Sequence, residues 1–287
     1  MTRRQELERH SHSLGEIREI MNSMKTLAYM ETRKLTRFLD AQHAVVRSIE
    51  ETAGDLLGFY PETLPEATET TPVYLLVGTE RGFCGDFNHT LLSYLESALE
   101  AHPSDRPLLI AVGRKLHALL EEESRVAACI VGTGVVEEVD AVLIQVVNEL
   151  TSVQSKRGVL TLYGLYHGGD GIVMQKLLPP FQNLLHRPPR FPHPPLCNRS
   201  PRDLLVELTE HYLFALLHDM LYTSLIVENH YRLAHLDGAV RHLDNESAEL
   251  AQRCNALRQE EIIEEIEVIL LSAADVDEKG NEVMKRS

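Results

Sequence analysis

One stretch, Thr79–Asn88, gathers the residue types that could do chemistry, and it reads Thr-Glu-Arg-Gly-Phe-Cys-Gly-Asp-Phe-Asn. It follows a short apolar run and opens an amphipathic one, which is the position of a nucleotide-binding loop between a strand and a helix. The stretch has neither a GxGxxG nor a GK[ST] pattern, and the carboxylates of Glu80 and Asp86 would repel a phosphate. We therefore interpret it as a tight turn that needs its glycines for backbone reasons.

Other candidate catalytic groups do not combine into a site. Cys84 could act as a nucleophile only beside a base, for which His89 is available in the sequence. Glu228 and Asp237 lie nine residues apart on one expected helix, so they cannot form an acid/base pair on one turn. The sequence therefore predicts no active site, no cofactor and no small-molecule substrate for this chain.

The cysteines and histidines give no metal motif. The four cysteines are far apart and form no CxxC pair, so we expect free thiols in a reducing compartment. His186, His193 and Cys197 share a proline-rich segment, but their spacing fits no common zinc site. We expect no bound metal. The cysteines are Cys84, Cys129, Cys197 and Cys254.

Composition and charge bound the class of protein. Apolar residues make up 44% and charged residues 25%, as in ordinary soluble proteins. A net charge of −15 argues against nucleic acid as the main partner. The first residues are polar and charged, and no apolar run approaches 18 residues, so we expect neither a signal peptide nor a membrane span. The acidic stretch 260–267 is either a solvated helix face or a surface matched to a partner.

Proline divides the chain into three parts. All 13 prolines lie between Pro61 and Pro201, so both ends are free to form long helices and the middle is not. We predict a helix over 1–60, an α/β domain over 70–185, and a second helix over 202–279. About 70 uninterrupted helical residues would reach about 100 Å, well beyond a globular domain.

Both end segments carry heptad repeats, which are typical of a coiled coil. We expect the two helices to pack antiparallel, because the chain reverses between them and neither can bury its apolar stripe alone. The N-terminal series are Leu7, Leu14, Met21, Ala28, Leu35, Gln42, Ile49 and Leu56, completed by Ile17, Met24, Phe38 and Val45. The C-terminal series is Leu236, Val240, Leu243, Ser247, Leu250, Cys254, Leu257, Glu261, Glu264, Val268 and Leu271.

The middle alternates short apolar runs with amphipathic ones, which predicts a Rossmann-like α/β domain with a parallel sheet. A glycine-rich turn at 168–171 suggests a hairpin that returns through 172–178. The predicted strands are 72–78, 107–113, 127–131 and 158–163, and the predicted helices are 88–99, 114–123 and 135–150.

Three stretches in order resemble the gamma subunit of the rotary F-type ATP synthases. Ile20–Ala28 is similar to the family's I-T-x-A-M-x-x-V-A, and Thr79–Asn88 to its S-D-R-G-L-C-G-x-x-N turn. Glu228–Asp237 is similar to E-N-x-x-R-x-x-A-M-D, and Asn255–Ile266 to N-x-x-R-Q-x-x-I-T-x-E-I. The chain departs from the family pattern where Ile263 replaces a threonine and in its additional glutamates and its tail.

The resemblance implies a rotor, or central stalk, with no catalytic site of its own. The coiled coil would insert into a head of alpha and beta subunits that binds ATP, and the α/β domain would contact the epsilon subunit and the c-ring. The chain would be a peripheral protein on the cytoplasmic side of the cell membrane, coupling proton or sodium ion transport to ATP synthesis or hydrolysis.

Three groups of residues carry the implied contacts. Met24 and Lys25, expected across the coil from Arg258 and Gln259, would contact a moving lever of the beta subunit. The second group would fill a bearing in the head, and the third would shape the turn of the α/β domain; for every group, packing within the chain is the alternative reading. The second group is Ile262 and Ile266 with Val268–Leu271, and the third is Arg81, Cys84 and Asn88.

Two other functions stay open on the sequence. One is a small α/β nucleotide-binding enzyme with helical extensions, which needs a functional loop at Thr79–Asn88. The other is an autonomous coiled-coil scaffold, which would be stable and self-associate without partner subunits.

Overall fold

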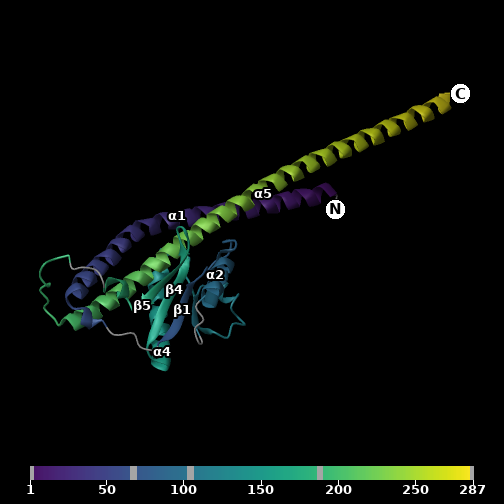
Figure 1. Ribbon diagram of the computed structural model, residues 1–287. Coiled ribbons are helices and arrows are strands. Elements are labelled where there is room, and N and C mark those ends of the chain that lie inside the picture. The colour runs from purple at the N-terminus through teal and green to yellow at the C-terminus, as the bar shows by residue number, and fades with distance from the viewer. Residues whose placement is uncertain (1–2, 65–69, 102–106, 186–189, 285–287) are drawn as a thin grey trace. The chain divides into compact units, whose positions relative to one another are not determined.

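The computed structural model describes residues 3–64, 70–101, 107–185 and 190–284, and side chains up to Leu270. Two helices are much longer than any other element: α1 (Arg3–Phe59) and α5 (Pro201–Met284) (Figure 1). The chain forms two compact units, Met1–Lys25 with Leu236–Ser287, and Thr26–His235. Both long helices run from one unit into the other.

The larger unit holds a five-stranded sheet of order β3-β2-β1-β4-β5. The first four strands are parallel and β5 is antiparallel to β4, so the predicted parallel sheet and its closing hairpin are confirmed. The strands are β1 (Thr71–Val77), β2 (Leu108–Val112), β3 (Val126–Ile130), β4 (Leu160–Gly168) and β5 (Gly171–Leu178). The helices between them are α2 (Phe87–Ala101), α3 (Arg114–His117) and α4 (Val139–Arg157), with 3-10 turns at Pro61–Thr63, Val136–Glu138 and Gln182–Leu184.

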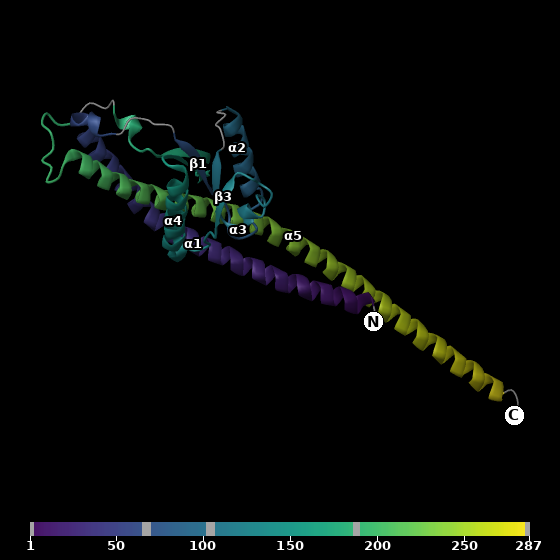
Figure 2. The same cartoon turned by 90° about the horizontal axis from the view of Figure 1, so that it is seen from below.

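Each face of this sheet is covered by a different set of helices. Alternate side chains of β1 point to opposite faces, as the pleat of a strand requires. Leu76 joins an apolar cluster with α2 and α3, which includes Leu91 and Leu116. Val73 and Leu75 join a larger cluster with α1, α4 and α5. The α5 helix is therefore part of the core of this unit as well as half of the coiled coil (Figure 2).

The helix predicted at 114–123 is wrong in its length, because α3 ends at His117. After it the backbone tightens, and Leu119 and Leu120 donate to carbonyl groups three residues earlier. The Glu123 side chain accepts the backbone N–H and the guanidinium of Arg125, and this contact turns the chain into β3. Three consecutive glutamates at 121–123 thus form the turn rather than a last helical turn.

In the smaller unit, α1 and α5 pack antiparallel. Ion pairs join Arg4 to Glu261 at 2.8 Å, Arg18 to Asp244, and Lys25 to Asp237 at 2.6 Å, so residue numbers rise on one helix as they fall on the other. The predicted α5 seam is confirmed as far as Glu261, because each member is buried or half-buried. Beyond it, Glu264 and Val268 are exposed, and Leu271 lies outside the described side chains.

Three of the four residues of the second N-terminal series are wrong, whereas Met24 is half-buried as predicted. The first series, from Leu7 to Leu56, is buried or half-buried, but Ile17, Phe38 and Val45 are 42%, 52% and 47% exposed. Most other positions of the buried face come four residues after members of the first series, although Arg18, four residues after Leu14, is exposed. Both spacings repeat every seven residues, so the repeat alone does not decide between them. The prediction chose the more hydrophobic residues, whereas the positions that face α5 include polar ones. The buried or half-buried positions four residues after the first series are Ser11, Lys25, Thr32, Leu39, Val46 and Ala53.

Candidate functional site

The stretch Thr79–Asn88 joins β1 to α2 as a tight turn, as predicted. The Asn88 side chain closes it by accepting the N–H of Thr79 at 3.0 Å and donating to the Thr79 hydroxyl at 2.9 Å. Within the turn, Phe83 and Gly85 have φ values of 65° and 58°. Glycine adopts this left-handed region at no cost, whereas Phe83 is strained there.

Cys84 is buried in this turn and is no nucleophile. Its thiol lies within 3.7 Å of the Arg81 carbonyl and 3.4 Å of the Gly82 carbonyl, and its side chain makes no described contact with His89. Burial first, and the nearby Glu228 carboxylate second, raise the pKa of Cys84 to about 12. At neutral pH the group is therefore a thiol, and the thiol is not the reactive form.

Three polar side chains of α5 hold this turn. Arg232 donates from Nη1 to Asn229 Oδ1 at 2.7 Å and from Nη2 to the Glu228 carboxylate one helical turn away. The same guanidinium donates to the Gly82 carbonyl at 3.3 Å and to Cys84 Sγ at 3.4 Å. We call Glu228, Asn229, Arg232, Gly82 and Cys84 the Arg232 cluster. Its three helical residues are at most 5% exposed.

The Glu80 carboxylate makes contacts within the chain and is not free to bind a ligand. It accepts the N–H groups of Arg114 at 3.0 Å and Gly132 at 2.8 Å, and it pairs with the Arg114 guanidinium. These contacts tie the carboxyl end of β1 to the ends of β2 and β3. Glu80 is thus a structural link between strands.

A small cavity lies beyond the carboxyl ends of β1, β2 and β3. In open α/β sheets, ligands bind beyond the carboxyl ends of the strands. Here the space next to Gly78 and Gly132 is lined by Leu225 and Glu228 of α5, and a cavity of about 20 Å³ remains. That volume is too small for a nucleotide. The turn Thr79–Asn88 itself borders a separate hollow of about 330 Å³.

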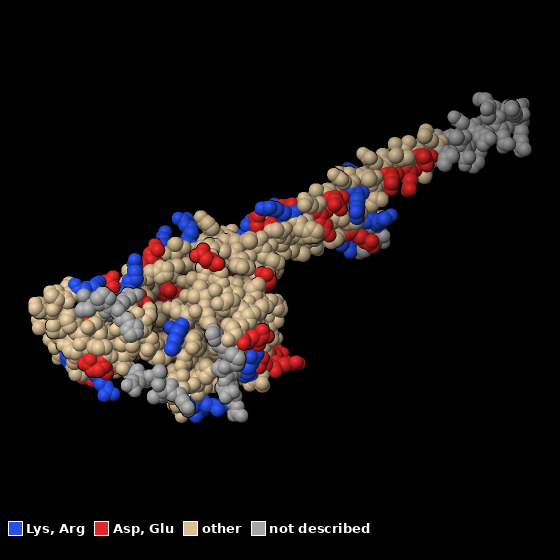
Figure 3. Space-filling view, viewed as in Figure 1, with Lys and Arg blue, Asp and Glu red and all other residues tan. Residues whose placement is uncertain are grey.

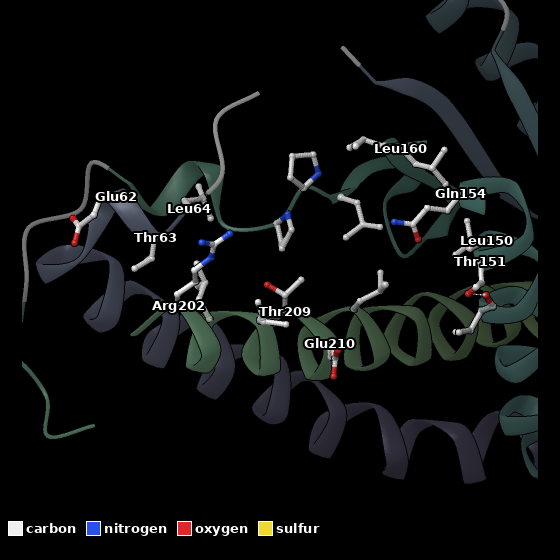
Figure 4. A pocket seen from close by; sticks show the side chains of 18 residues that line it. Glu62, Thr63, Leu64, Leu150, Thr151, Gln154, Leu160, Arg202, Thr209 and Glu210 are labelled. Carbon is white, nitrogen blue, oxygen red and sulfur yellow. Dashed lines mark hydrogen bonds between the residues drawn. The ribbon is translucent and has the colours of Figure 1, made fainter. Parts of the chain in front are cut away.

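A cavity of about 680 Å³ lies elsewhere in the same unit (Figure 4). It is lined by α4, the start of α5 and the prolines after β5, and its walls are mainly aliphatic side chains such as Leu150 and Leu205. The polar side chains labelled around it, among them Thr151 and Thr209, form no acid/base pair or nucleophile–base pair. The described residues also contain no cluster of side chains that could hold a metal ion.

The predicted coupling residues do not lie together. Lys25 pairs with Asp237, and Arg241 pairs with the same carboxylate from the next turn of α5. The expectation that Met24 and Lys25 lie across the coil from Arg258 and Gln259 is wrong. The antiparallel register places residues near Glu261 beside Arg4, so the two groups lie at opposite ends of the seam.

Apolar side chains are exposed on both helices of the smaller unit. On α5, Ile262 and Ile266 are 47% and 51% exposed, and Val268–Leu270 are exposed as well. On α1, Ile20 is 60% exposed. Exposed glutamates accompany the α5 residues, and Figure 3 shows acidic side chains gathered on α5 before the part drawn in grey. Arg258 and Gln259 are also exposed.

Two features of the site were not recognised in the sequence. Glu228, Asn229 and Arg232 were visible only as motif residues, and nothing in the sequence indicated their contact with the turn. Asp237, which holds Lys25, was visible only as a motif residue. None of the described helices has an apolar stretch that is long enough to cross a membrane.

Comparison with known proteins identifies the family. A protein-family model described as "ATP synthase" matches residues 3–275. The ATP synthase gamma chain of Acetivibrio thermocellus is 25% identical over 115 residues, which are 38% of this chain and 38% of that relative.

Solved structures show the same fold. The rotor of the Euglena gracilis mitochondrial ATP synthase, in rotational state 1, matches with a TM-score of 0.63 and 14% identity over 90% of this chain and 98% of that one. The central stalk/c-ring structure of the Tetrahymena thermophila enzyme matches with a TM-score of 0.55 and 17% identity over 77% and 99%. Because the family model covers nearly the whole sequence, the chain belongs to the ATP synthase family, and the gamma chain is the member that it resembles.

Proposed function

We propose that this chain is the gamma subunit of the central stalk of a rotary ATP synthase. In this role the paired ends of α1 and α5 enter a head of alpha and beta subunits, and the sheet-containing unit contacts the epsilon subunit and the c-ring. The chain then transmits torque between the ring and the head, coupling proton or sodium ion transport to ATP synthesis or hydrolysis. It is a peripheral component on the cytoplasmic side of the cell membrane.

The exposed apolar side chains on the coiled coil carry this proposal. A two-helix coil needs one apolar seam, and the seam from Leu236 to Glu261 is already used within the chain. Ile262, Ile266 and Ile20 lie outside it and are about half exposed or more. On α5 the exposed apolar side chains continue from Ile262 to Leu270, and an exposed apolar run of this kind marks a contact with a partner. A head that encloses the helices would cover these residues on both of them.

The helices suit a part that transmits force. Torque passes along a rod only if the rod is stiff, and prolines or helix breaks would make it bend. Neither α1 nor the part of α5 after Pro201 contains a proline, and α5 is continuous over 84 residues. Within this role, we propose that Met24, Lys25, Arg258 and Gln259 contact the head at two separate levels.

Co-expression with cognate alpha and beta subunits tests the proposed function. We expect a stoichiometric complex that survives affinity purification and size-exclusion chromatography. A chain that stays alone or forms only homo-oligomers in the presence of a folded head would contradict the proposal and favour the coiled-coil scaffold.

A further inference from the structure

A row of α5 side chains faces the turn between β1 and α2 within the larger unit. Arg232 reaches the Gly82 carbonyl at 3.3 Å and Cys84 Sγ at 3.4 Å. One turn further along α5, the His235 ring lies with its centroid 6.2 Å from that of Phe83. The turn is therefore held at several points by one face of the helix.

The turn is strained at the residue between the two groups that Arg232 binds. Phe83 has a φ of 65°, and its side chain is 44% exposed, so burial of the ring does not explain the conformation. A non-glycine residue keeps such a backbone only where its surroundings fix it. The conformation directs the Gly82 carbonyl and the Cys84 thiol toward one guanidinium, and this contact fixes it.

The guanidinium is itself held from the helix side. Glu228 and Asn229 accept two of its donors, and the three side chains are between 1% and 5% exposed. The planar fork of an arginine fits several acceptors in one orientation, which a lysine ammonium cannot do. The turn and the helix are thus joined by a buried contact of defined geometry. An ion pair on the surface would not fix their positions in this way.

We propose that Glu228 and Arg232 are positioning residues that fix the sheet-containing part of the larger unit to α5, so that torque applied to that part reaches the helix without slip. This inference rests on the proposed function. The helix continues unbroken from Arg232 through the seam residues, so a load accepted at the turn enters the element that forms half of the coil.

Paired substitutions in the assembled synthase test this role. The double variant Glu228→Gln/Arg232→Met removes both charges, so neither is left buried without a partner. We expect it to assemble and to support ATP hydrolysis by the detached head complex at the wild-type rate, because no torque passes through the turn there. Ion-driven ATP synthesis in vesicles should fall roughly threefold or more, as for other residues that couple two sites.

A control pair on the same helix separates this role from a general effect of charge. Glu249 and Arg253 have the same residue types and spacing but are 70% and 68% exposed. Glu249→Gln/Arg253→Met should leave both activities unchanged. Arg232→Lys, which keeps the charge and loses the fork, should lower synthesis and spare hydrolysis.

Two results would overturn the inference. One is unchanged synthesis in both cluster variants, and the other is an equal loss of hydrolysis and synthesis in Arg232→Lys, which would indicate a role in folding alone. A wild-type chain that forms no complex with the head would instead contradict the proposed function.

Discussion

Glu228 should make the stability of this chain depend on pH. Burial raises the pKa of its carboxyl to about 7, and the Arg232 guanidinium opposes this shift. The folded protein thus holds this proton over a pH range in which the unfolded chain, with an ordinary pKa of 4.5, has released it. The resulting stability is complete below pH 4.5 and is lost as pH rises through about 7.

Glu228→Gln should remove this dependence. Urea unfolding between about pH 5 and pH 8 should show a wild-type free energy of unfolding that falls by about 1–3 kcal/mol from this group, and a flatter profile in the variant. Glu249→Gln, at an exposed position of the same helix, should follow the wild type. Parallel profiles for Glu228→Gln and the wild type would show that the carboxyl titrates at its ordinary pKa.

Single residues also show where sequence reasoning stops. Asn88 and the glycines of Thr79–Asn88 were correctly predicted to shape a turn, because residue type limits backbone conformation directly. The partners of Cys84 and Glu80 could not be predicted. Each depends on a segment more than 30 residues away, Arg232 in one case and Arg114 with Gly132 in the other.

At the scale of elements, the spacing of apolar residues was predictable from the sequence, but the face of α1 that packs against α5 was not. The alternation of apolar runs predicted the parallel sheet, and the seven-residue spacing predicted the two long helices. The heptad repeat alone does not say whether residues three positions after the Leu7–Leu56 series, such as Ile17, or those four positions after it face α5. Ser11, Lys25 and Thr32 occupy that face, and Lys25 and Thr32 are tolerated because Lys25 pairs with Asp237 and Thr32 donates to the Ala28 carbonyl.

Apolar contacts, and not the ion pairs, should hold the coiled coil together. Leu236 is fully buried, and Leu236→Ala should lower the free energy of unfolding by about 2–5 kcal/mol. The side chains of Lys25 and Asp237 are 31% and 38% exposed, and a double-mutant cycle between alanine variants should give a coupling of only about 0.2–1 kcal/mol. Chemical denaturation measures both. A coupling as large as the leucine effect would mean that the charges stabilise the pairing rather than select its register.

At the scale of the whole molecule, the chain separates residues that stabilise it from residues that remain for a partner. Buried seam residues such as Leu250, 5% exposed, serve the first purpose. Ile262 and Ile266 continue the same helix after the last described ion pair to α1, at Glu261. Sequence reasoning could assign these isoleucines to a bearing only through the family resemblance, because apolarity alone does not distinguish a seam from an interface.

The variant Ile262→Ser/Ile266→Ser should therefore weaken assembly and leave the chain itself intact. Its free energy of unfolding should stay within about 0.5 kcal/mol of the wild type, as is usual for exposed positions. Its affinity for the alpha–beta head, measured by titration of labelled chain, should fall, because two apolar side chains no longer leave water on binding. Ile262→Val/Ile266→Val keeps the apolar character and should bind nearly as the wild type. Leu250→Ser gives the opposite control, since it should destabilise the free chain. If Ile262→Ser/Ile266→Ser destabilised the chain as Leu250→Ser does, the isoleucines would belong to the chain's own packing. They would then no longer support the proposed rotor function.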